Sequence, residues 1–302
     1  MACYVLASKE PELLDILEGG PNVFALPLLK GGQTNLAIVG IDVLLRAVGE
    51  DEERKQKTPF KIVAADFQRN PVGWVIHPEV GRRAGLPPDS WKEKTGKARN
   101  DWLFERLSSG ELKLGDKVGT ETTAMWLAWR SQRGYKQTSE PVPVGFDPKI
   151  VQDEPKLAYP VYLNEEPYKL RGMIKADVLV FDPADDGVSV YGNVLATTAS
   201  EITRRKDEIL AFREKYIGAW TAAASDLDAA TTEVLKYYKG VDRAIVKEQI
   251  EKTIAFATFN STEFGTLDAK PDGKLDRTLK VFQSSGSVSK AVTPEVLREL
   301  LI

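Results

Sequence analysis

The sequence predicts an α/β fold, because apolar runs of strand length alternate with helical segments as far as Thr198. Residues 35–40 form such a run, and Asp42 and a helical segment through Ala47 follow it. A second run, residues 60–65, is followed in the same way by an acidic residue. Beyond these repeats the pattern changes to long helices. Alternation of this kind favours mixed, mainly parallel sheets flanked by helices.

The N-terminal part of the chain is predicted to be helical. Residues 1–18 carry apolar side chains near helical spacing, and Pro11 breaks or kinks this helix because proline lacks a backbone N–H. A turn is expected at residues 19–22, where two glycines precede a proline. A short helix over residues 24–30 then ends at a glycine pair, since glycine commonly closes a helix.

The central part is predicted to contain a polar excursion and then further strands. Residues 79–115 are polar and rich in Pro, Gly, Lys and Asp, so we expect them at the surface, with one helix at residues 100–108. Residues 116–130 are typical of a short strand, a Gly/Thr turn and a helix. The other predicted elements are strands at residues 72–76, 141–145, 157–163, 175–181 and 188–196, and helices at 147–152, 200–224, 227–238, 242–258 and 293–301.

Length, charge and composition exclude several classes of function. The chain has 302 residues, which suits one large domain or two lobes, and its net charge of -3 gives no reason to expect nucleic acid as a partner. No apolar run approaches the roughly 20 residues that cross a bilayer. Cys3 and His77 are the only residues of their types, so we expect no intramolecular disulfide, no metal and no cofactor. The N-terminus lacks the features of a secretory signal, so the mature protein is cytoplasmic or the chain lacks its export segment.

Two segments suggest a pocket for a small molecule. In the first, Gly119 precedes hydroxyl and carboxylate side chains where a helix is expected to start, and free N–H groups there attract a carboxylate, sulfonate, phosphate or polar ring. The second, residues 158–168, gathers aromatic, amide and acidic side chains between prolines. Neither segment has the residues of a bond-breaking centre, so we expect no enzyme. The candidate ligand-binding residues here are Thr120, Glu121, Thr122, Tyr162, Asn164 and Glu165.

Several of these features also have a plainer interpretation. Asn164 could cap a helix that has Glu165 in its first turn. Trp126 and Trp129 are predicted to pack in the core rather than to stack on a ligand. The aspartates of residues 182–186 lack the ligand spacing of a calcium loop, so a solvated turn is expected there.

An ordered set of motifs resembles the substrate-binding proteins of ABC importers, in the thiamine-pyrimidine-synthase-like subgroup. That subgroup also holds nitrate-, sulfonate- and taurine-type binders. The motifs are Gly-Gly-Pro-Asn (19–22), Gly-Gln-Thr-Asn-Leu-Ala-Ile-Val-Gly-Ile-Asp (32–42), Phe-Gln-Arg-Asn-Pro-Val-Gly-Trp-Val-Ile-His-Pro (67–78), Val-Gly-Thr-Glu-Thr (118–122), Tyr-Pro-Val-Tyr-Leu-Asn-Glu-Glu-Pro (159–167) and Val-Tyr-Gly-Asn-Val-Leu-Ala-Thr (190–197). Relative to that family, a first strand is missing ahead of Ala2.

The resemblance implies a periplasmic-binding-protein-like (type 2) fold, with two α/β lobes that close on a ligand in the cleft. Lobe 1 would be residues 1–76 plus 190–302 and lobe 2 residues 77–189, with crossover strands at 72–77 and 188–195. Gly40 and Asp42 are further candidates because they follow a predicted strand, where α/β sheets bind ligands, although Asp42 could be only an N-cap. The resemblance adds Gln68, Asn70, Tyr191 and Asn193 as candidate ligand-binding residues, although Tyr191 and Asn193 could equally pack in the core.

The implied function is that of the solute-binding component of an ABC importer. Its ligand would be a thiamine-precursor pyrimidine or related heterocycle, or a sulfonate- or nitrate-type anion. Its other partner would be a membrane permease, and the protein would be a monomer located in the periplasm or tethered to a membrane. One alternative is a pyrimidine-phosphate synthase of thiamine biosynthesis, but that reaction needs a cysteine-rich iron motif and a donor histidine. The other is a cytosolic ligand sensor of the same fold.

Overall fold

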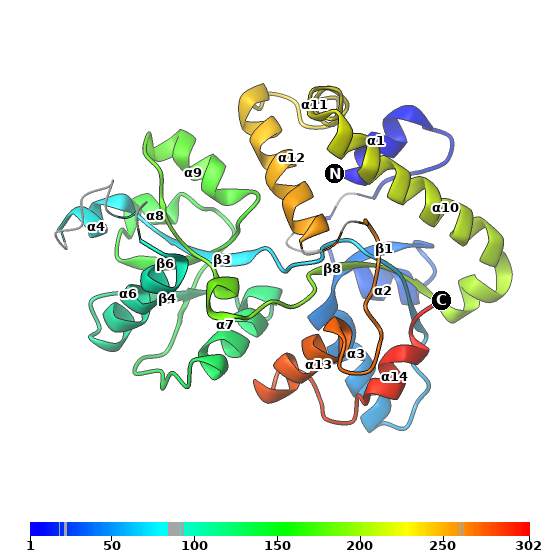
Figure 1. Cartoon of the computed structure of the whole chain (residues 1–302), viewed down its shortest axis with the longest axis horizontal. Coiled ribbons are helices and arrows are strands. Elements are labelled where there is room, and N and C mark those ends of the chain that lie inside the picture. Colours follow the sequence, from blue (N-terminus) through cyan, green and yellow to red (C-terminus); the bar gives the residue numbers. More distant parts are fainter. Residues whose placement is uncertain (18, 21–22, 84–90, 92–93, 260, 262) are drawn as a thin grey trace. The chain divides into compact units, whose positions relative to one another are not determined.

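A computed structural model describes the chain apart from residues 18, 21–22, 84–90, 92–93, 260 and 262. The chain divides into two compact units, each of which combines a β-sheet with helices (Figure 1). Unit 1 consists of Met1–Asn70, Val190–Gln283 and Val288–Ile302, and unit 2 consists of Pro71–Ser189 and Ser284–Ser287. The predicted α/β class is therefore confirmed.

The sheet of unit 1 has the strand order β1-β8-β2. Its strands are β1 (Ala37–Gly40), β2 (Phe60–Ala65) and β8 (Asn193–Thr198), and β8 pairs antiparallel with both neighbours. Gly40 lies opposite Asn193, and Ala65 lies opposite Val194. The carboxyl ends of β1 and β2 and the amino end of β8 therefore lie at one edge of the sheet.

The helices of unit 1 follow the predicted order, with one addition. α1 ends at Lys9, shortly before Pro11, because the residue that precedes a proline is disfavoured in helical conformation. α13 was not predicted, and α10 contains a break at Arg205, whose φ and ψ are -148° and 43°. In Figure 1, α1 lies beside α10 and α11, with which it packs. The helices are α1 (Ala2–Lys9), α2 (Ala25–Lys30), α3 (Ile41–Glu53), α10 (Ala199–Ser225), α11 (Leu227–Leu235), α12 (Arg243–Thr258), α13 (Lys274–Ser284) and α14 (Pro294–Glu299).

The sheet of unit 2 has the strand order β5-β4-β6-β3-β7. β4 is parallel to β5 and β6, whereas β3 is antiparallel to β6 and β7. Its strands are β3 (Val72–Ile76), β4 (Lys113–Asp116), β5 (Val142–Pro143), β6 (Leu157–Tyr162) and β7 (Leu179–Phe181).

Both sheets are mixed or antiparallel, and the expected predominance of parallel pairs is not found among the described strands. The reason is the position of β3 and β8. The chain passes between the units at Asn70–Pro71 and at Ser189–Val190, and β3 and β8 are the strands that follow these two points. Each enters its sheet antiparallel to the neighbours on both sides.

The helices of unit 2 include one that sequence reasoning placed wrongly at the surface. The described part of residues 79–115 contains Trp91, Trp102 and Leu103, all of which are buried, and Trp102 stacks on Phe181 of β7. The helix predicted at residues 100–108 is present as α6, and residues 84–90 and 92–93 of this segment lie outside the described residues. The helices are α4 (Pro78–Arg83), α6 (Gly96–Ser108), α7 (Glu121–Gln132), α8 (Ile150–Asp153), α9 (Glu166–Ile174) and the 3-10 helix η1 (Pro183–Asp186).

Two tryptophans of α7 form part of the core of unit 2, as predicted. Trp126 and Trp129 are buried, and both rings contact Trp74 of β3, with ring centroids 5.6 and 5.3 Å apart. Phe104 of α6 lies against the same pair at 5.4 and 4.9 Å. Such pairs add about 0.5–1.5 kcal/mol beyond area burial, so this cluster fixes α6 and α7 on the sheet.

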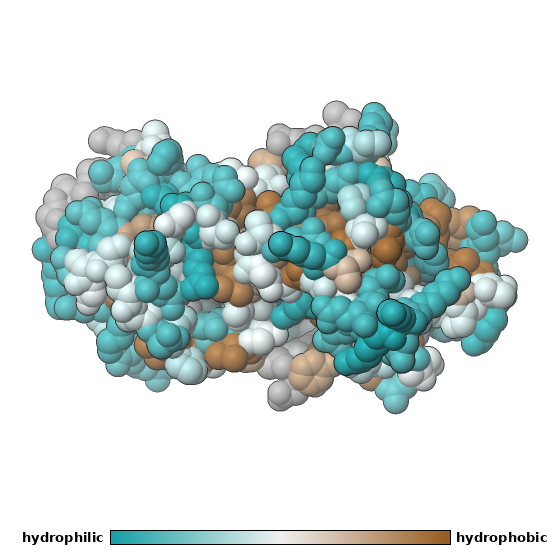
Figure 2. Space-filling model, turned by 90° about the horizontal axis from the view of Figure 1, so that it is seen from below, coloured by the Kyte–Doolittle hydropathy of each residue, from teal (hydrophilic) through white to brown (hydrophobic). Residues whose placement is uncertain are grey.

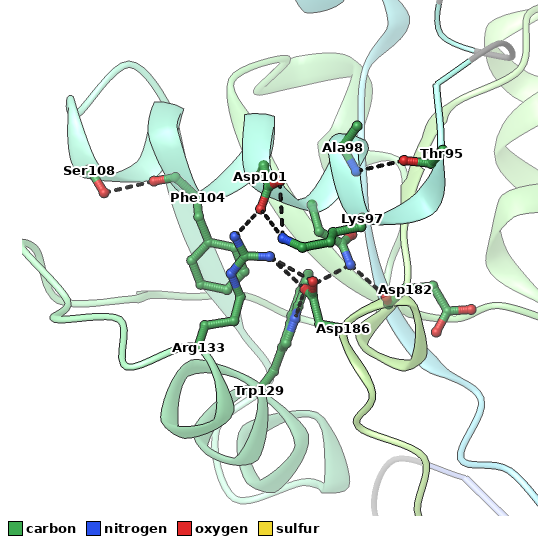
Figure 3. Close-up of polar contacts among 11 residues, drawn as sticks. Thr95, Lys97, Ala98, Asp101, Phe104, Ser108, Trp129, Arg133, Asp182 and Asp186 are labelled. Carbon is green, nitrogen blue, oxygen red and sulfur yellow. Dashed lines mark hydrogen bonds and ion pairs between the residues drawn. The ribbon is translucent and has the colours of Figure 1, made fainter.

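The acidic turn at residues 182–186 is not the solvated turn that the sequence suggested. Figure 3 shows Trp129 and Arg133 converging on Asp186, and the carboxylate accepts hydrogen bonds from Trp129 Nε1 at 2.7 Å and from Arg133 Nη1 at 2.8 Å. Asn100 Nδ2 donates a further bond at 2.9 Å. The side chain of Asp186 is only 5% exposed, and these donors replace the hydration that a lone aspartate would lose there.

Much of the surface in view in Figure 2 is hydrophilic, with smaller hydrophobic areas between the charged side chains. Among the described residues no helix combines the length and the hydropathy that a membrane span needs.

Candidate functional site

The strand ends of unit 2 form the first candidate site. β4 and β6 are adjacent and parallel, so their carboxyl ends meet at one edge of the sheet. The chain leaves β4 towards β5 on one side and leaves β6 towards β7 on the other. Ligands of open α/β sheets bind where strand connections diverge in this way. The two segments selected from the sequence follow these two strands.

The loop after β4 places three predicted residues together. Thr120 is the N-cap of α7, and its hydroxyl accepts a hydrogen bond from the backbone N–H of Thr122 at 3.3 Å. The same hydroxyl donates to the carbonyl of Lys117 at 2.7 Å and lies 2.8 Å from the Thr122 hydroxyl. Glu121 follows in the first helical turn and is buried. The Thr120 hydroxyl therefore caps the N-terminus of α7, and the Thr122 hydroxyl lies within hydrogen-bond distance of it.

A hydrogen bond joins this loop to the end of β6. Tyr162 donates its phenolic O–H to Glu121 Oε2 at 3.1 Å, although 41 positions separate them in the chain. Tyr162 is half-buried, so the pair lies at the rim of the packed sheet. A buried carboxylate beside a tyrosine hydroxyl offers an acceptor and a directional polar group to a small molecule.

Sequence reasoning missed a second polar pair beneath the first. Lys117 is buried and donates to Glu166 Oε1 at 3.0 Å, and the other oxygen of Glu166 accepts from the backbone N–H of Tyr162 at 2.7 Å. The ammonium of Lys117 also lies 4.7 Å from the ring centroid of Tyr159. This ion pair ties the β4–α7 loop to the end of β6. The position of Lys117 directly after a strand was the only signal for it in the sequence.

Asn164 and Glu165 lie in the loop that leaves β6. Glu165 is the N-cap residue of α9, but its side chain caps no backbone N–H, so the expected cap at Asn164 is not the one that forms. The carboxylate of Glu165 pairs with Lys169 at 2.5 Å, one helical turn further along. The structure brings Thr120, Glu121, Thr122 and Tyr162 together at the strand ends. Asn164 and Glu165 follow Tyr162 closely in the chain.

The strand ends of unit 1 form the second candidate site, and five of its predicted residues lie along one edge. Gly40 pairs with Asn193 across β1 and β8. The backbone carbonyl of Asn193 accepts hydrogen bonds from the N–H groups of Asp66 at 2.8 Å and Phe67 at 3.0 Å. The chain that leaves β2 is thus fixed to the start of β8.

Gln68 and Asn70 belong to the segment that leaves β2, and both are buried. The side-chain amide of Gln68 donates to the carbonyl of Thr266 at 2.7 Å, and the backbone N–H of Asn70 donates to the carbonyl of Val190 at 2.9 Å. These bonds hold the segment against the residues before β8.

Tyr191 is buried at the same edge, and a lysine that sequence reasoning missed lies over its ring. The tyrosine hydroxyl accepts from the backbone N–H of Asp268 at 2.8 Å. Burial raises the pKa of Tyr191 above its ordinary value. The ammonium of Lys274 lies 4.8 Å from the centroid of the Tyr191 ring and donates to the carbonyl of Gln68. Lys274 is the first residue of α13, the helix that was not predicted.

Asp42 differs from the other predicted residues because it is fully buried in the first turn of α3. Its carboxylate pairs with Arg46 at 3.1 Å, one turn along the helix. Burial raises the pKa of Asp42, while the neighbouring guanidinium acts in the opposite direction. The carboxylate of Asp42 therefore pairs within its own helix, α3, rather than with the residues at the strand ends of unit 1.

No group of three His, Cys, Asp or Glu side chains arranged to hold a metal ion exists in the part of the chain that the structure describes. Burial raises the pKa of the Cys3 thiol to about 11, so this cysteine is not a reactive thiolate at neutral pH. His77 follows β3, as predicted, and burial lowers its pKa. The described polar groups are suited to hydrogen bonding and charge recognition.

This architecture is the periplasmic binding protein fold. The CA3427 gene product of Candida albicans, which defines a family of proteins with that generic fold, matches with a TM-score of 0.59 and 11% identity over 99% of this chain and 90% of that chain. No family model matches the chain, and no curated protein matches it.

Two solved structures of ligand-binding proteins also have a fold similar to that of this chain. The alkanesulfonate-binding protein SsuA from Xanthomonas axonopodis pv. citri, solved with bound MOPS, matches with a TM-score of 0.63 and 12% identity over 100% of this chain and 94% of that chain. A ligand-binding component of an ABC-type import system from Staphylococcus aureus, solved with zinc bound, matches with a TM-score of 0.57 and 13% identity over 99% and 94%. At these identities the similarity concerns the fold.

Proposed function

We propose that this protein binds a small polar solute and delivers it to the membrane permease of an ABC importer. The polar network at the strand ends of unit 2 is the observation that carries the proposal. Glu121 and Tyr162 are hydrogen-bonded at 3.1 Å, and the buried Lys117–Glu166 ion pair fixes the backbone below them. Polar groups that packing and hydrogen bonds already hold in place lose little entropy when a ligand binds.

Two similar structures support a binding role rather than catalysis, since SsuA is an alkanesulfonate-binding protein and the Staphylococcus aureus chain is a ligand-binding component of an ABC-type import system. We propose a periplasmic or membrane-tethered location and a monomeric protein that returns its ligand unchanged. The composition agrees, because a single cysteine cannot form the cysteine-rich iron motif that a pyrimidine-phosphate synthase needs.

The ligand classes that we propose are an aminopyrimidine-like heterocycle and a small sulfonate- or nitrate-type anion. Glu121 would accept a hydrogen bond from an exocyclic amine, and Tyr162 would lie beside the ring. Thr120 and Thr122 at the start of α7, together with Asn164 and Glu165, would complete the contacts in unit 2. In unit 1 we propose contacts from the edge that carries Gly40, Gln68, Asn70, Tyr191 and Asn193.

A thermal-shift screen over aminopyrimidines, flavins, alkanesulfonates and nitrate tests this proposal. A solute at about 100 times its dissociation constant adds about 2.7 kcal/mol to the free energy of unfolding. We expect Glu121→Gln and Tyr162→Phe to weaken binding of the best solute by roughly 10-fold each. Glu121→Gln removes the charge and replaces one acceptor oxygen with an N–H donor, and Tyr162→Phe removes the hydroxyl, so each loses an interaction worth about 1.5 kcal/mol.

Glu140→Gln is the matched control, since Glu140 is exposed in the same unit and the substitution changes the charge equally. It should leave the dissociation constant unchanged. A folded protein whose melting temperature responds to no solute in the screen would overturn the proposed function.

A further inference from the structure

Lys274 is a half-buried cation for which the described part of the chain supplies no counterion. Its ammonium has three N–H donors, of which one is given to the carbonyl of Gln68, and no other acceptor for it exists among the described residues. The rings of Tyr191 and Phe259 lie 4.8 and 5.7 Å away, so aromatic faces flank the charge.

Two other shielded cations of the described chain have a carboxylate beside them. Lys117 pairs with Glu166 at 3.0 Å, and Arg46 pairs with Asp42 at 3.1 Å. Asp268 is an acidic neighbour of Lys274, but its carboxylate accepts from the backbone N–H of Lys274 at 3.1 Å rather than pairing with the ammonium. Among the described residues, the ammonium of Lys274 therefore lacks the kind of carboxylate partner that Lys117 and Arg46 have.

The surrounding charges make the position more positive. Arg69 lies in the segment after β2, with its guanidinium 5.0 Å from the centroid of the Phe259 ring, and Arg277 is one turn along α13. Burial first, and then Arg277 and Arg69, lower the pKa of Lys274 to about 8, while Asp268 acts in the opposite direction. An anion placed near the ammonium would relieve both the desolvation and the repulsion.

We propose that Lys274 is the oxyanion contact of unit 1, so that the solute carries a carboxylate, sulfonate or phosphate group that the ammonium receives beside Gln68 and Tyr191. This inference rests on the proposed function and specifies its ligand class. A neutral aminopyrimidine would use the acceptors of unit 2 but would leave the charge of Lys274 without a counterion. A solute with an anionic group satisfies it.

Pulsed acetylation read out by mass spectrometry tests the proposal even while the natural solute is unidentified. Because only the neutral amine reacts, Lys274 should be acetylated with a midpoint near pH 8, well below the roughly 10.4 of an ordinary lysine. The probes are acetate, methanesulfonate and inorganic phosphate at equal ionic strength, and we expect at least one to slow acetylation of Lys274 fivefold or more at pH 8. Lys270, which is exposed, is the internal reference and should not change.

A pair of variants separates recognition from structure. Lys274→Met keeps a side chain of similar length beside Tyr191 and removes the charge, whereas Lys270→Met removes an exposed charge in the segment that precedes α13. Lys274→Met should weaken binding of the protecting oxyanion by about 10- to 100-fold, the effect of a charged hydrogen bond, and Lys270→Met should have no effect.

The outcomes distinguish this inference from the proposed function. If neutral solutes stabilise the protein while no oxyanion protects Lys274, the function stands and the inference is wrong. Equal slowing of Lys270 and Lys274 by every anion would also overturn it, because that pattern is a general salt effect. If the protein responds to no solute of any class, the proposed function fails first.

Discussion

At the scale of single residues, the two candidate sites differ in how they balance buried charge. In unit 2 the buried ammonium of Lys117 has Glu166 as its partner, and that carboxylate also accepts from the backbone of Tyr162. In unit 1 the half-buried Lys274 has, among the described residues, a carbonyl acceptor and aromatic faces. A buried charge pair is costly to break from one side, whereas a cation without a counterion is ready to receive one.

We predict that Lys117→Met destabilises the protein by about 3–5 kcal/mol, because it leaves Glu166 buried without a cation. The double variant Lys117→Met with Glu166→Gln should recover part of this loss, since it removes both charges. Urea denaturation of the two variants measures the difference. A single variant that is as stable as the unmodified protein would show that the pair does not fix the loop after β4.

At the scale of elements, the network on Asp186 connects three parts of unit 2. Asn100 belongs to α6, Trp129 to the interior of α7, and Arg133 follows α7, while Asp186 ends η1 (Figure 3). Arg133 also lies over the Phe104 ring at 4.5 Å and pairs with Asp101. The network therefore fixes the helices on which the strand-end site of unit 2 depends.

We expect Asp186→Ala to cost about 3–5 kcal/mol in the free energy of unfolding, because Arg133 and Trp129 would lose their shared acceptor in a buried position. Asp185→Ala is the matched control. Asp185 is partly exposed and lies 3.9 Å from Arg99, so its removal should cost less than about 1 kcal/mol. Chemical denaturation measures both, and equal losses would mean that the network is not what stabilises this region.

At the scale of the whole molecule, the class of fold and the chain order of its strands could be predicted from sequence. The runs at residues 60–65 and 72–76 became β2 and β3 with the expected bounds, because strand length and flanking turns are local signals. The direction of β3 and β8 could not be predicted, since it depends on where the chain passes from one unit to the other.

The candidate sites could be predicted only in part, because their contacts join residues that lie far apart in the chain. Thr120 and Tyr162 follow predicted strands, and the resemblance pointed to Gln68 and Tyr191. Pairings such as Glu121 with Tyr162, or Lys274 with Gln68, join residues far apart in the chain, and no local pattern specifies them. Helix α13, which starts at Lys274, does carry apolar residues at helical spacing, so the sequence contains a local signal for it.

The central claim is that the protein binds a small solute and leaves it intact, and equilibrium dialysis with recovery of the solute tests it most directly. The purified chain is dialysed against the solute that stabilises it most in the thermal-shift screen, then denatured, and the released solute is quantified by mass spectrometry. The account predicts one solute molecule per chain, recovered with its mass unchanged. Recovery of a converted product, or no retention above the free concentration, would contradict it.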